Sequence, residues 1–343
     1  MVCDQWLGSN GYAGMNALRR AGWIIHEVPE WRFVPVHWRS SHMRALGRLL
    51  RPAAVREFNH ALLRTVRQLH PEVLLVFKGM FVRAETIMAI RATGVRAYCF
   101  YPDVSFRTHG PNLPAALQQY DWIFSTKTFG LRDMREQLGI TRSSLLRHAY
   151  DPDLHRPIDV TDADRRRYEC DVSFIGTWSP KKERLLTILT DRRPRLRVRV
   201  WGNQWKRASQ TTSLRSSLAL RAVVGEEYVR AIAASKINLA ILSEQRTGAS
   251  SGDLLTSRSF HIPACAGFML HERTSELGEV LAENESVACF SDADEMIDKI
   301  DLYLANDPAR AAIAARGRQA VALAHSWDDR IREILAHHEA GIV

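Results

Sequence analysis

At 343 residues, the chain is longer than one compact domain usually is, and its length predicts two domains of roughly 150 to 170 residues. Its 46% of apolar residues suffices for two cores, but no run approaches the roughly 20 apolar residues of a membrane span and the opening residues do not form a signal peptide, so we expect a cytoplasmic protein. The net charge of +9 calls for an anionic partner, which leaves nucleic acid, membrane phospholipid and a phosphorylated substrate open.

Short apolar runs alternate with helical patterns through residues 1–150, which predicts βαβ units and a parallel sheet in an N-terminal domain. One helical pattern covers residues 12–22 and another covers residues 55–71. The expected strands are 1–3, 23–28, 73–77, 95–101, 122–125 and 144–148. The first of these strands is short.

Residues 151–168 contain two prolines and many charges without a convincing period, so we expect a linker there. Alternation restarts in residues 169–325, which predicts a second domain of the same class. Its expected strands are 170–176, 196–201, 236–242, 268–270 and 286–290. The closing segment 326–343 has a helical pattern, and packing back on the N-terminal domain is one arrangement open to it.

Two loops stand out because ligands of open parallel sheets bind beyond the carboxyl ends of the strands. The loop 243–253 follows a buried strand and leads into a helix with Arg258 in its first turn. A cation there opposes the helix dipole unless an anion binds nearby. The turn 176–184 places Lys181 and Lys182 at a second helix start. The alternatives are an arginine folded onto a surface carboxylate and a solvated basic helix face.

Metal and cofactor sites are not expected. The Asp-x-Asp runs at 151–153 and 162–164 fall in the linker, and the run at 292–294 opens a helix, where acidic residues act as caps. The five cysteines lack a Cys-x-x-Cys pair, so neither a structural zinc site nor a disulfide framework is predicted. The phosphate-binding loop of P-loop proteins is also missing from the sequence.

Residues 258–268, RSFHIPACAGF, resemble the run R-(T/S)-F-E-I-P-A-C-G-G-F of CgeB-like glycosyltransferases, a spore-maturation type with the GT-B fold. Similar pieces of that family stand at residues 174–186, 200–205, 271–277 and 325–335. The resemblance implies an α/β chain of two doubly wound Rossmann-like domains facing a cleft. It also implies a nucleotide-sugar donor on the second domain and an acceptor on the first.

The resemblance implies that Lys181, Lys182 and Arg258 stabilise the negative charge of the leaving phosphate without a metal. One departure is His261, eight positions after Asp253, where many GT-B transferases have a second acidic residue. Histidine is a poorer partner for a ribose diol, so the departure implies an altered donor, a rebuilt site or lost activity. The full set of expected donor residues is Gly176, Thr177, Trp178, Lys181, Lys182, Gly202, Trp205, Asp253, Arg258, Ser259 and His261. Core or rim packing is the alternative for the two tryptophans.

The catalytic base is expected in the first domain, where residues 101–106, YPDVSF, resemble an aromatic-plus-aspartate loop of the family. Deprotonation of an acceptor hydroxyl needs a carboxylate or an imidazole within hydrogen-bond reach. Asp103 is the first candidate, and Asp4 and His109 follow it. Capping of a turn is the alternative role for Asp103.

The sequence therefore predicts a glycosyltransferase that moves a sugar from a nucleotide-diphosphate donor to an unidentified acceptor. The alternatives are a nucleotide-sugar epimerase or hydrolase of the same fold and a non-catalytic GT-B-like binding partner. Nucleic acid is not expected as a partner, because the basic residues are spread along the chain without a known binding motif. Residues 30–51 interleave aromatic residues with arginines, which leaves peripheral contact with the inner face of a membrane open beside an acceptor-binding role.

Overall fold

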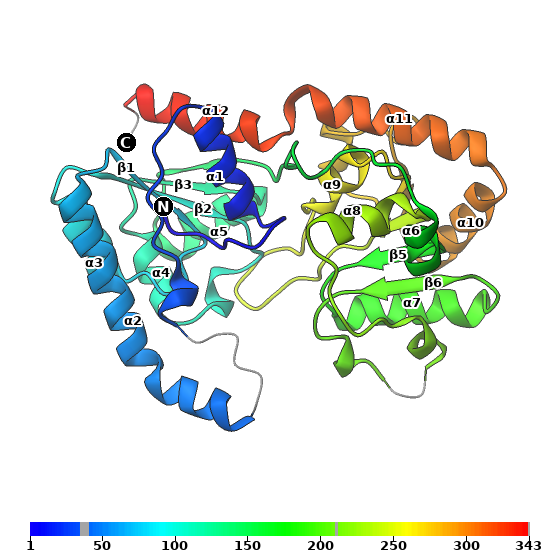
Figure 1. The fold of residues 1–343 in the computed structure, drawn as a ribbon, viewed down its shortest axis with the longest axis horizontal. Coiled ribbons are helices and arrows are strands. Elements are labelled where there is room, and N and C mark those ends of the chain that lie inside the picture. Colours follow the sequence, from blue (N-terminus) through cyan, green and yellow to red (C-terminus); the bar gives the residue numbers. More distant parts are fainter. Residues whose placement is uncertain (35–40, 210–211, 342–343) are drawn as a thin grey trace. The chain divides into compact units, whose positions relative to one another are not determined.

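The structure is a computed structural model that describes residues 1–34, 41–209 and 212–341. The chain divides into two compact units. Unit 1 comprises Met1–Arg147, Gln245–Ser251 and the chain from Arg330 onward, and unit 2 comprises His148–Glu244 and Gly252–Asp329. Each unit has one parallel sheet flanked by helices (Figure 1). The predicted class of two Rossmann-like α/β domains is confirmed.

The sheet of unit 1 has four parallel strands in the order β1-β2-β3-β4. Its first three strands are buried nearly throughout because helices cover them, which explains why they read as continuous apolar runs, whereas the fourth is half-buried. The strands are β1 (Val73–Phe77), β2 (Arg96–Tyr101), β3 (Trp122–Ser125) and β4 (Ser143–Leu145). A single bridge from Val2 to Val76 stands where the sequence predicted an opening strand. The predicted strand 23–28 is not formed as one.

The helices of unit 1 include the first and the last helix of the chain. Ser9 caps the first helix by accepting a hydrogen bond from Tyr12 N–H, and Gly139 ends the fifth with φ at 68°. The helices are α1 (Asn10–Arg20), α2 (Ser41–Leu69), α3 (Ala84–Arg91), α4 (Asn112–Leu117), α5 (Thr128–Leu138) and α12 (Trp327–Glu339), with short 3₁₀ turns at Glu30–Arg32 and Phe106–Thr108.

The sheet of unit 2 has five parallel strands in the order β6-β5-β7-β8-β9. The strands are β5 (Cys170–Ile175), β6 (Val198–Trp201), β7 (Ser235–Ala240), β8 (Met269–Glu272) and β9 (Ala288–Phe290). The strand order reverses at β5, between its neighbours β6 and β7. In doubly wound sheets, a ligand crevice forms beyond the carboxyl ends of the strands at such a switch point. The turn after β5 and the loop after β7 begin there.

The helices of unit 2 are α6 (Asp162–Tyr168), α7 (Pro180–Arg192), α8 (Glu226–Ala233), α9 (Arg258–Ala264), α10 (Ala293–Leu304) and α11 (Asp307–Ala324), and 3₁₀ turns lie at Trp205–Arg207, Ser213–Ser217 and Leu277–Glu279. Helix α6 lies in the segment that the sequence predicted to be a linker. A capping box between Thr161 and Asp164 starts this helix, and an ion pair from Asp164 to Arg230 joins it to α8 at 2.9 Å. The whole expected linker, residues 151–168, therefore lies within unit 2.

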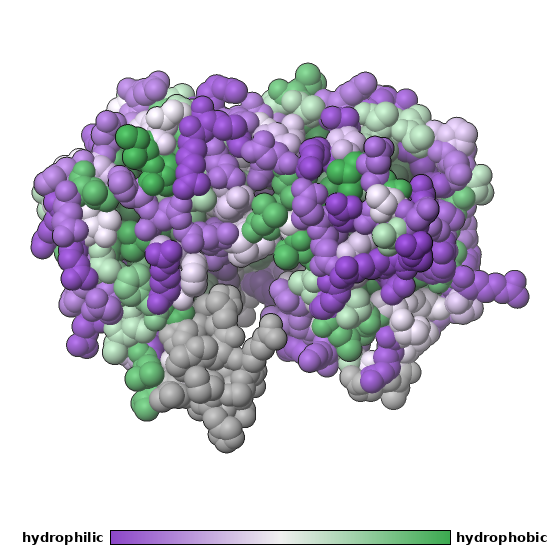
Figure 2. Space-filling view, viewed as in Figure 1, coloured by the Kyte–Doolittle hydropathy of each residue, from purple (hydrophilic) through white to green (hydrophobic). Residues whose placement is uncertain are grey.

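No helix in the described part of the chain combines the length and apolarity needed to cross a bilayer. Hydrophilic side chains predominate on the face drawn in Figure 2, and apolar ones are scattered among them. Trp38 and Arg39, from the segment expected to offer membrane contact, lie outside the described residues.

Candidate functional site

The carboxyl edge of the unit 2 sheet begins with two closely packed glycine turns. Gly202 follows β6 with φ at 144°, and a Cβ added to it would lie 2.0 Å from the carbonyl oxygen of Gly176 after β5. A Cβ added to Gly176 would lie 2.9 Å from a guanidinium nitrogen of Arg258. Glycine at both positions therefore lets the two turns touch and leaves room for the Arg258 head group.

The Arg258 guanidinium lies across the ends of β5 and β7. It donates hydrogen bonds to the carbonyl of Ile241 at 2.8 Å and the carbonyl of Ile175 at 3.4 Å, and it stands 5.3 Å from the centre of the Phe174 ring. Burial lowers the pKa of Arg258, against the raising effect of Tyr228 and Asp253. Within the described part of the chain, its Nε–H is buried without a hydrogen-bond partner. The site thus contains a cation suited to an anionic ligand.

The lysines at the start of α7 are already paired. Lys181 Nζ forms an ion pair with Glu272 at 2.6 Å, and its backbone N–H donates to Glu244 Oε1 at 3.0 Å. Lys182 is buried, and its Nζ donates to Ser243 Oγ at 3.1 Å and to Thr177 O at 3.3 Å. A carboxylate of the chain therefore caps the helix start at which the sequence predicted a phosphate. The two lysines tie the turn after β5 to the ends of β7 and β8.

The two candidate tryptophans differ in exposure. Trp205 is buried in the core of unit 2, and its indole N–H donates to Gly176 O at 2.8 Å. Trp178 is half-buried, with its indole N–H bonded to Glu183 at 2.6 Å and the Arg207 guanidinium 4.4 Å from its ring centre. Trp205 supports the glycine turns from within, whereas the Trp178 ring is accessible at the surface.

The side chains of Ser259 and His261 face the interior of unit 2. Ser259 Oγ lies 2.8 Å from Nε2 of the buried His271. His261 Nε2 lies 3.1 Å from Ala149 O, and its ring stacks on His155 with 3.8 Å between ring centres. Burial lowers the pKa of His261 to about 4. Asp253 donates its backbone N–H to Ser243 O at 2.9 Å. Asp253 and Arg258 are partly exposed, whereas Ser259 and His261 are buried, so only the first two lie within reach of a ligand.

A second polar cluster stands at the carboxyl edge of the unit 1 sheet. Asp103 Oδ2 lies 2.6 Å from Lys78 Nζ and 3.0 Å from His109 Nε2. Burial raises the pKa of Asp103, but hydrogen bonding to His109 and the charge of Lys78 outweigh this effect and hold the pKa well below its usual range. Asp4 follows the Val2 bridge at the same edge and is exposed. Two of the three predicted base candidates therefore lie within ion-pair distance of each other.

Sequence reasoning missed two members of this region, Lys78 and Glu30. Lys78 directly follows β1, which is the parallel neighbour of β2. Its position beside the loop after β2 could therefore have been predicted from the sequence. Glu30 accepts a hydrogen bond from Phe81 N–H at 3.2 Å, and burial, reinforced by the charge of Asp4, raises its pKa to about 7. No periodic or motif signal marks Glu30, because its environment is built by residues distant in sequence.

The loop Gln245–Ser251 groups with unit 1 although both of its flanks belong to unit 2. Ser105 Oγ donates to Thr247 O at 2.6 Å, and Gln137 Nε2 donates to Gly248 O at 2.8 Å. Among the described residues, no group of three or more histidine, cysteine, aspartate or glutamate side chains is arranged to hold a metal ion.

Comparison with known proteins finds a family resemblance over part of the chain. Residues 180–336 match the model of a family described as glycosyl transferase-like. No curated protein sequence matches the chain significantly. The match starts at α7 and covers the donor-side candidates Lys181, Lys182, Asp253 and Arg258.

Several solved structures are similar to this chain over most of its length. Sucrose-phosphate synthase (tll1590) from Thermosynechococcus elongatus is similar over 99% of this chain and 97% of its own, with 12% identity and a TM-score of 0.67. A glycosyltransferase from Rickettsia africae ESF-5 is similar over 99% and 96%, with 10% identity and a TM-score of 0.66. Anabaena Alr3699/HepE, solved in complex with UDP-glucose, is similar over 82% of each chain, with 10% identity and a TM-score of 0.60. These likenesses show the two-domain GT-B fold.

Proposed function

We propose that this glycosyltransferase-like chain of GT-B fold transfers a sugar from a nucleotide-diphosphate donor to an acceptor hydroxyl without a metal ion. The observation that carries the proposal is the Arg258 guanidinium, held at the switch point of unit 2 with an unpartnered Nε–H. The complex of Anabaena Alr3699/HepE with UDP-glucose supports a donor of this class. The assignment to the CgeB-like type within the glycosyltransferases rests on the run 258–268 and is part of the proposal.

Unit 2 binds the donor in this proposal. Transfer breaks the bond between the anomeric carbon and the diphosphate, so negative charge grows on the leaving phosphate oxygen. A fixed cation next to that oxygen stabilises the charge without reorganising. Arg258 supplies this cation, whereas Lys181 and Lys182 keep the turn after β5 in place through Glu272 and Ser243.

Unit 1 activates the acceptor. Asp103 is a weak base because Lys78 and His109 stabilise its ionised form. His109 is the proposed proton acceptor of the pair, because its imidazole can take up a proton at the ring nitrogen that does not face Asp103. In the proposed mechanism, His109 takes the proton of the acceptor hydroxyl, and Asp103 orients the imidazole and stabilises the imidazolium that results. The proposed mechanism therefore ranks His109 ahead of Asp103, the first candidate from the sequence, as the catalytic base.

A thermal-shift screen against UDP, GDP, dTDP, CDP and their common sugars tests the donor assignment. A ligand at about 100 times its Kd adds about 2.7 kcal/mol to native stability, which is visible as a higher Tm. Arg258→Ala should weaken binding of the stabilising nucleotide by about 10- to 150-fold, because one charge-assisted contact is lost. Arg199→Ala, which removes an exposed arginine from β6, is the matched control and should bind normally.

Unchanged nucleotide affinity in a folded Arg258→Ala protein would contradict the phosphate role. Release of free nucleotide and sugar at the same rate with and without acceptor would identify a hydrolase instead. Absence of any nucleotide response in the parent protein would favour a non-catalytic GT-B-like binding partner.

A further inference from the structure

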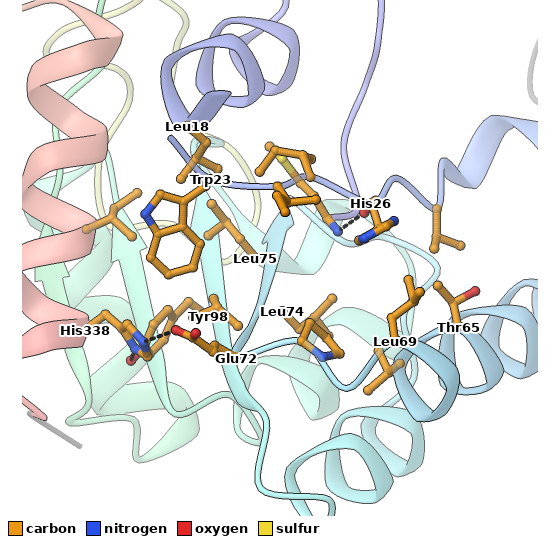
Figure 3. A pocket seen from close by; sticks show the side chains of 18 of the residues that line it. Leu18, Trp23, His26, Thr65, Leu69, Glu72, Leu74, Leu75, Tyr98 and His338 are labelled. Carbon is orange, nitrogen blue, oxygen red and sulfur yellow. Dashed lines mark hydrogen bonds and ion pairs between the residues drawn. The ribbon is translucent and has the colours of Figure 1, made fainter. Parts of the chain in front are cut away.

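A cavity in unit 2 is lined mainly by arginines. Its volume of about 500 Å³ is close to the 490 Å³ of a cavity in unit 1, whose lining around Leu18, Leu69 and Leu75 is mostly apolar (Figure 3). The lining of the unit 2 cavity, called the arginine cavity below, includes Arg165, Arg166, Arg197, Arg199, Ser216 and Ser217. All four arginines are exposed, so a ligand can reach them from solvent.

The arginine cavity lies at the amino edge of the unit 2 sheet, where β5 and β6 begin. Arg165 and Arg166 lie in the last turn of α6, which leads into β5. Arg197 and Arg199 flank Val198, the first residue of β6. Because β5 and β6 pair in parallel, the two strand starts are adjacent. The glycine turns of the candidate site follow the opposite ends of the same strands, so the cavity is separate from the proposed donor site.

The head groups of these arginines converge on the start of β5. Arg197 forms an ion pair with Glu169 at 2.7 Å. Its hydrogen bond lowers the pKa of Glu169, and the charge of Arg165 adds to this effect. Burial raises the pKa of Cys170 to about 11, and the charges of Arg199 and Arg197 are among the effects that oppose it. Since the influence of a charge falls with distance, these three guanidinium groups lie near the same strand start.

The protein itself does not balance the charge of the arginine cavity. Glu169 is already bound by Arg197, and no other carboxylate is found among the described residues that line the cavity. Within the described part of the chain, the other three arginines of the cluster take part in no ion pair. Like charges that are held together repel one another, so an anion bound between them would lower the free energy of the cluster.

We propose that the arginine cavity binds an anion that carries two or more phosphate groups. A guanidinium group offers a fork of N–H donors that matches the oxygens of a phosphate. A phosphate monoester carries about −1.5 to −2 charges near neutral pH, so one phosphate does not balance three arginines without an ion pair, whereas two phosphates do. The hydroxyl of Ser217, which also lines the cavity, adds a neutral hydrogen-bond donor.

Titration calorimetry with tripolyphosphate in metal-free buffer tests the proposal on the full chain. Tripolyphosphate should bind at one site and about tenfold or more tightly than inorganic phosphate, because its linked phosphates contact several arginines at once. Arg199→Gln should weaken this binding by about tenfold or more, since one charge-assisted contact is lost. Arg318→Gln is the matched control, because it removes the same charge from an exposed position of α11 and should leave the affinity unchanged.

Vesicles that contain phosphatidylinositol bisphosphate distinguish the source of the phosphates. Flotation of the parent chain with these vesicles, but not of Arg199→Gln, would identify a lipid headgroup as the ligand. Tripolyphosphate binding without flotation would identify a soluble ligand.

The proposal would be overturned by a parent chain that does not bind tripolyphosphate. Equal weakening in Arg199→Gln and Arg318→Gln would overturn it too, because net charge alone would then explain the binding. Loss of binding in Arg258→Ala with full binding in Arg199→Gln would place tripolyphosphate in the donor site instead. Tighter binding of a single-stranded oligonucleotide than of tripolyphosphate would assign the arginines to nucleic acid.

Discussion

His109 and Asp103 are the residues on which the proposed chemistry of unit 1 depends. His109→Ala should lower kcat by about 10²- to 10⁴-fold, because the proton acceptor is removed. Asp103→Asn should lower kcat less, because it leaves the imidazole in place and removes only its orienting carboxylate. Initial rates with the donor found by thermal shift, and the Tm shift given by that donor, measure both effects. Donor binding should survive in both variants. Full activity in His109→Ala together with inactivity in Asp103→Asn would assign the base to Asp103.

Gly202 offers a test of the glycine turns that is independent of activity. Gly202→Ala should destabilise the protein by roughly 2 kcal/mol or more, because the new methyl group meets Gly176 O and the φ of 144° strains any L side chain. Gly278→Ala is the matched control, since a Cβ there meets no atom within 4 Å and its φ is not positive. Urea unfolding measures both variants. Equal midpoints would show that the turn after β6 relaxes without cost.

The sequence allowed candidate site residues to be predicted from their positions in loops that follow strands. Gly176, Arg258 and Asp103 were predicted as site residues because loops at the carboxyl ends of parallel strands carry ligands, and this role stays a prediction. Their partners were not predictable, because Glu272 meets Lys181 from 91 residues away and Lys78 reaches Asp103 from the neighbouring strand. His261 was identified as a departure from a family pattern, but its stacking on His155 depends on the fold of residues 149–155.

At the start of helix α7, a carboxylate from the loop after β7 occupies the position where an anion could bind. Glu244 accepts the Lys181 N–H, and hydrogen bonds to the helix start and the charge of Lys182 lower the pKa of Glu244 against the raising effect of burial. Glu244→Ala should destabilise the protein by about 1 kcal/mol at pH 7. Because the folded pKa lies below the usual value of 4.5, this contribution is present above pH 4.5 and fades as the pH falls. Urea midpoints at pH 7 and pH 4 measure it, with Glu279→Ala as an exposed control.

Most elements were predictable because burial on both faces leaves a continuous apolar run. The strands β1 to β3 were expected within one residue of their observed ends for this reason. Helix α6 was missed, because its capping box and the Arg230 ion pair stabilise a stretch that has no apolar period. The predicted strand 23–28 did not form, since its partner is only the short segment at Met1.

For the molecule as a whole, the alternation of strands and helices was enough to predict two α/β domains with parallel sheets. The solved structures with TM-scores of 0.60 to 0.67 agree with this prediction at 10% to 12% identity, so the fold follows from the pattern more than from individual residues. The grouping of Gln245–Ser251 with unit 1 was not predictable. It depends on hydrogen bonds to Ser105 and Gln137, which are distant in sequence.

Three buried histidines of unit 2 should make the stability of the protein depend on pH. Burial lowers the pKa of His261 and His271 to about 4 and lowers that of His155 well below its usual value, with the His261 charge as a further cause for His155. In the unfolded chain these groups titrate near 6.5, so between about pH 6.5 and pH 4 the unfolded state binds more protons than the folded state. Stability is therefore full above pH 6.5 and falls toward pH 4.

Each of His261 and His271 should remove on the order of 3 kcal/mol of stability by pH 4, since a shift of one pKa unit corresponds to about 1.4 kcal/mol. Urea unfolding between pH 7 and pH 4.5 measures the loss, and its slope gives the number of protons taken up on unfolding. His261→Gln should reduce that slope by about one proton, because it removes one titrating group. His60→Gln, at an exposed position of α2, should leave the slope unchanged. A stability that stays constant down to pH 5 in the parent chain would mean that the three imidazoles can take up protons in the folded state, and that the stacked pair of His155 and His261 is open to solvent.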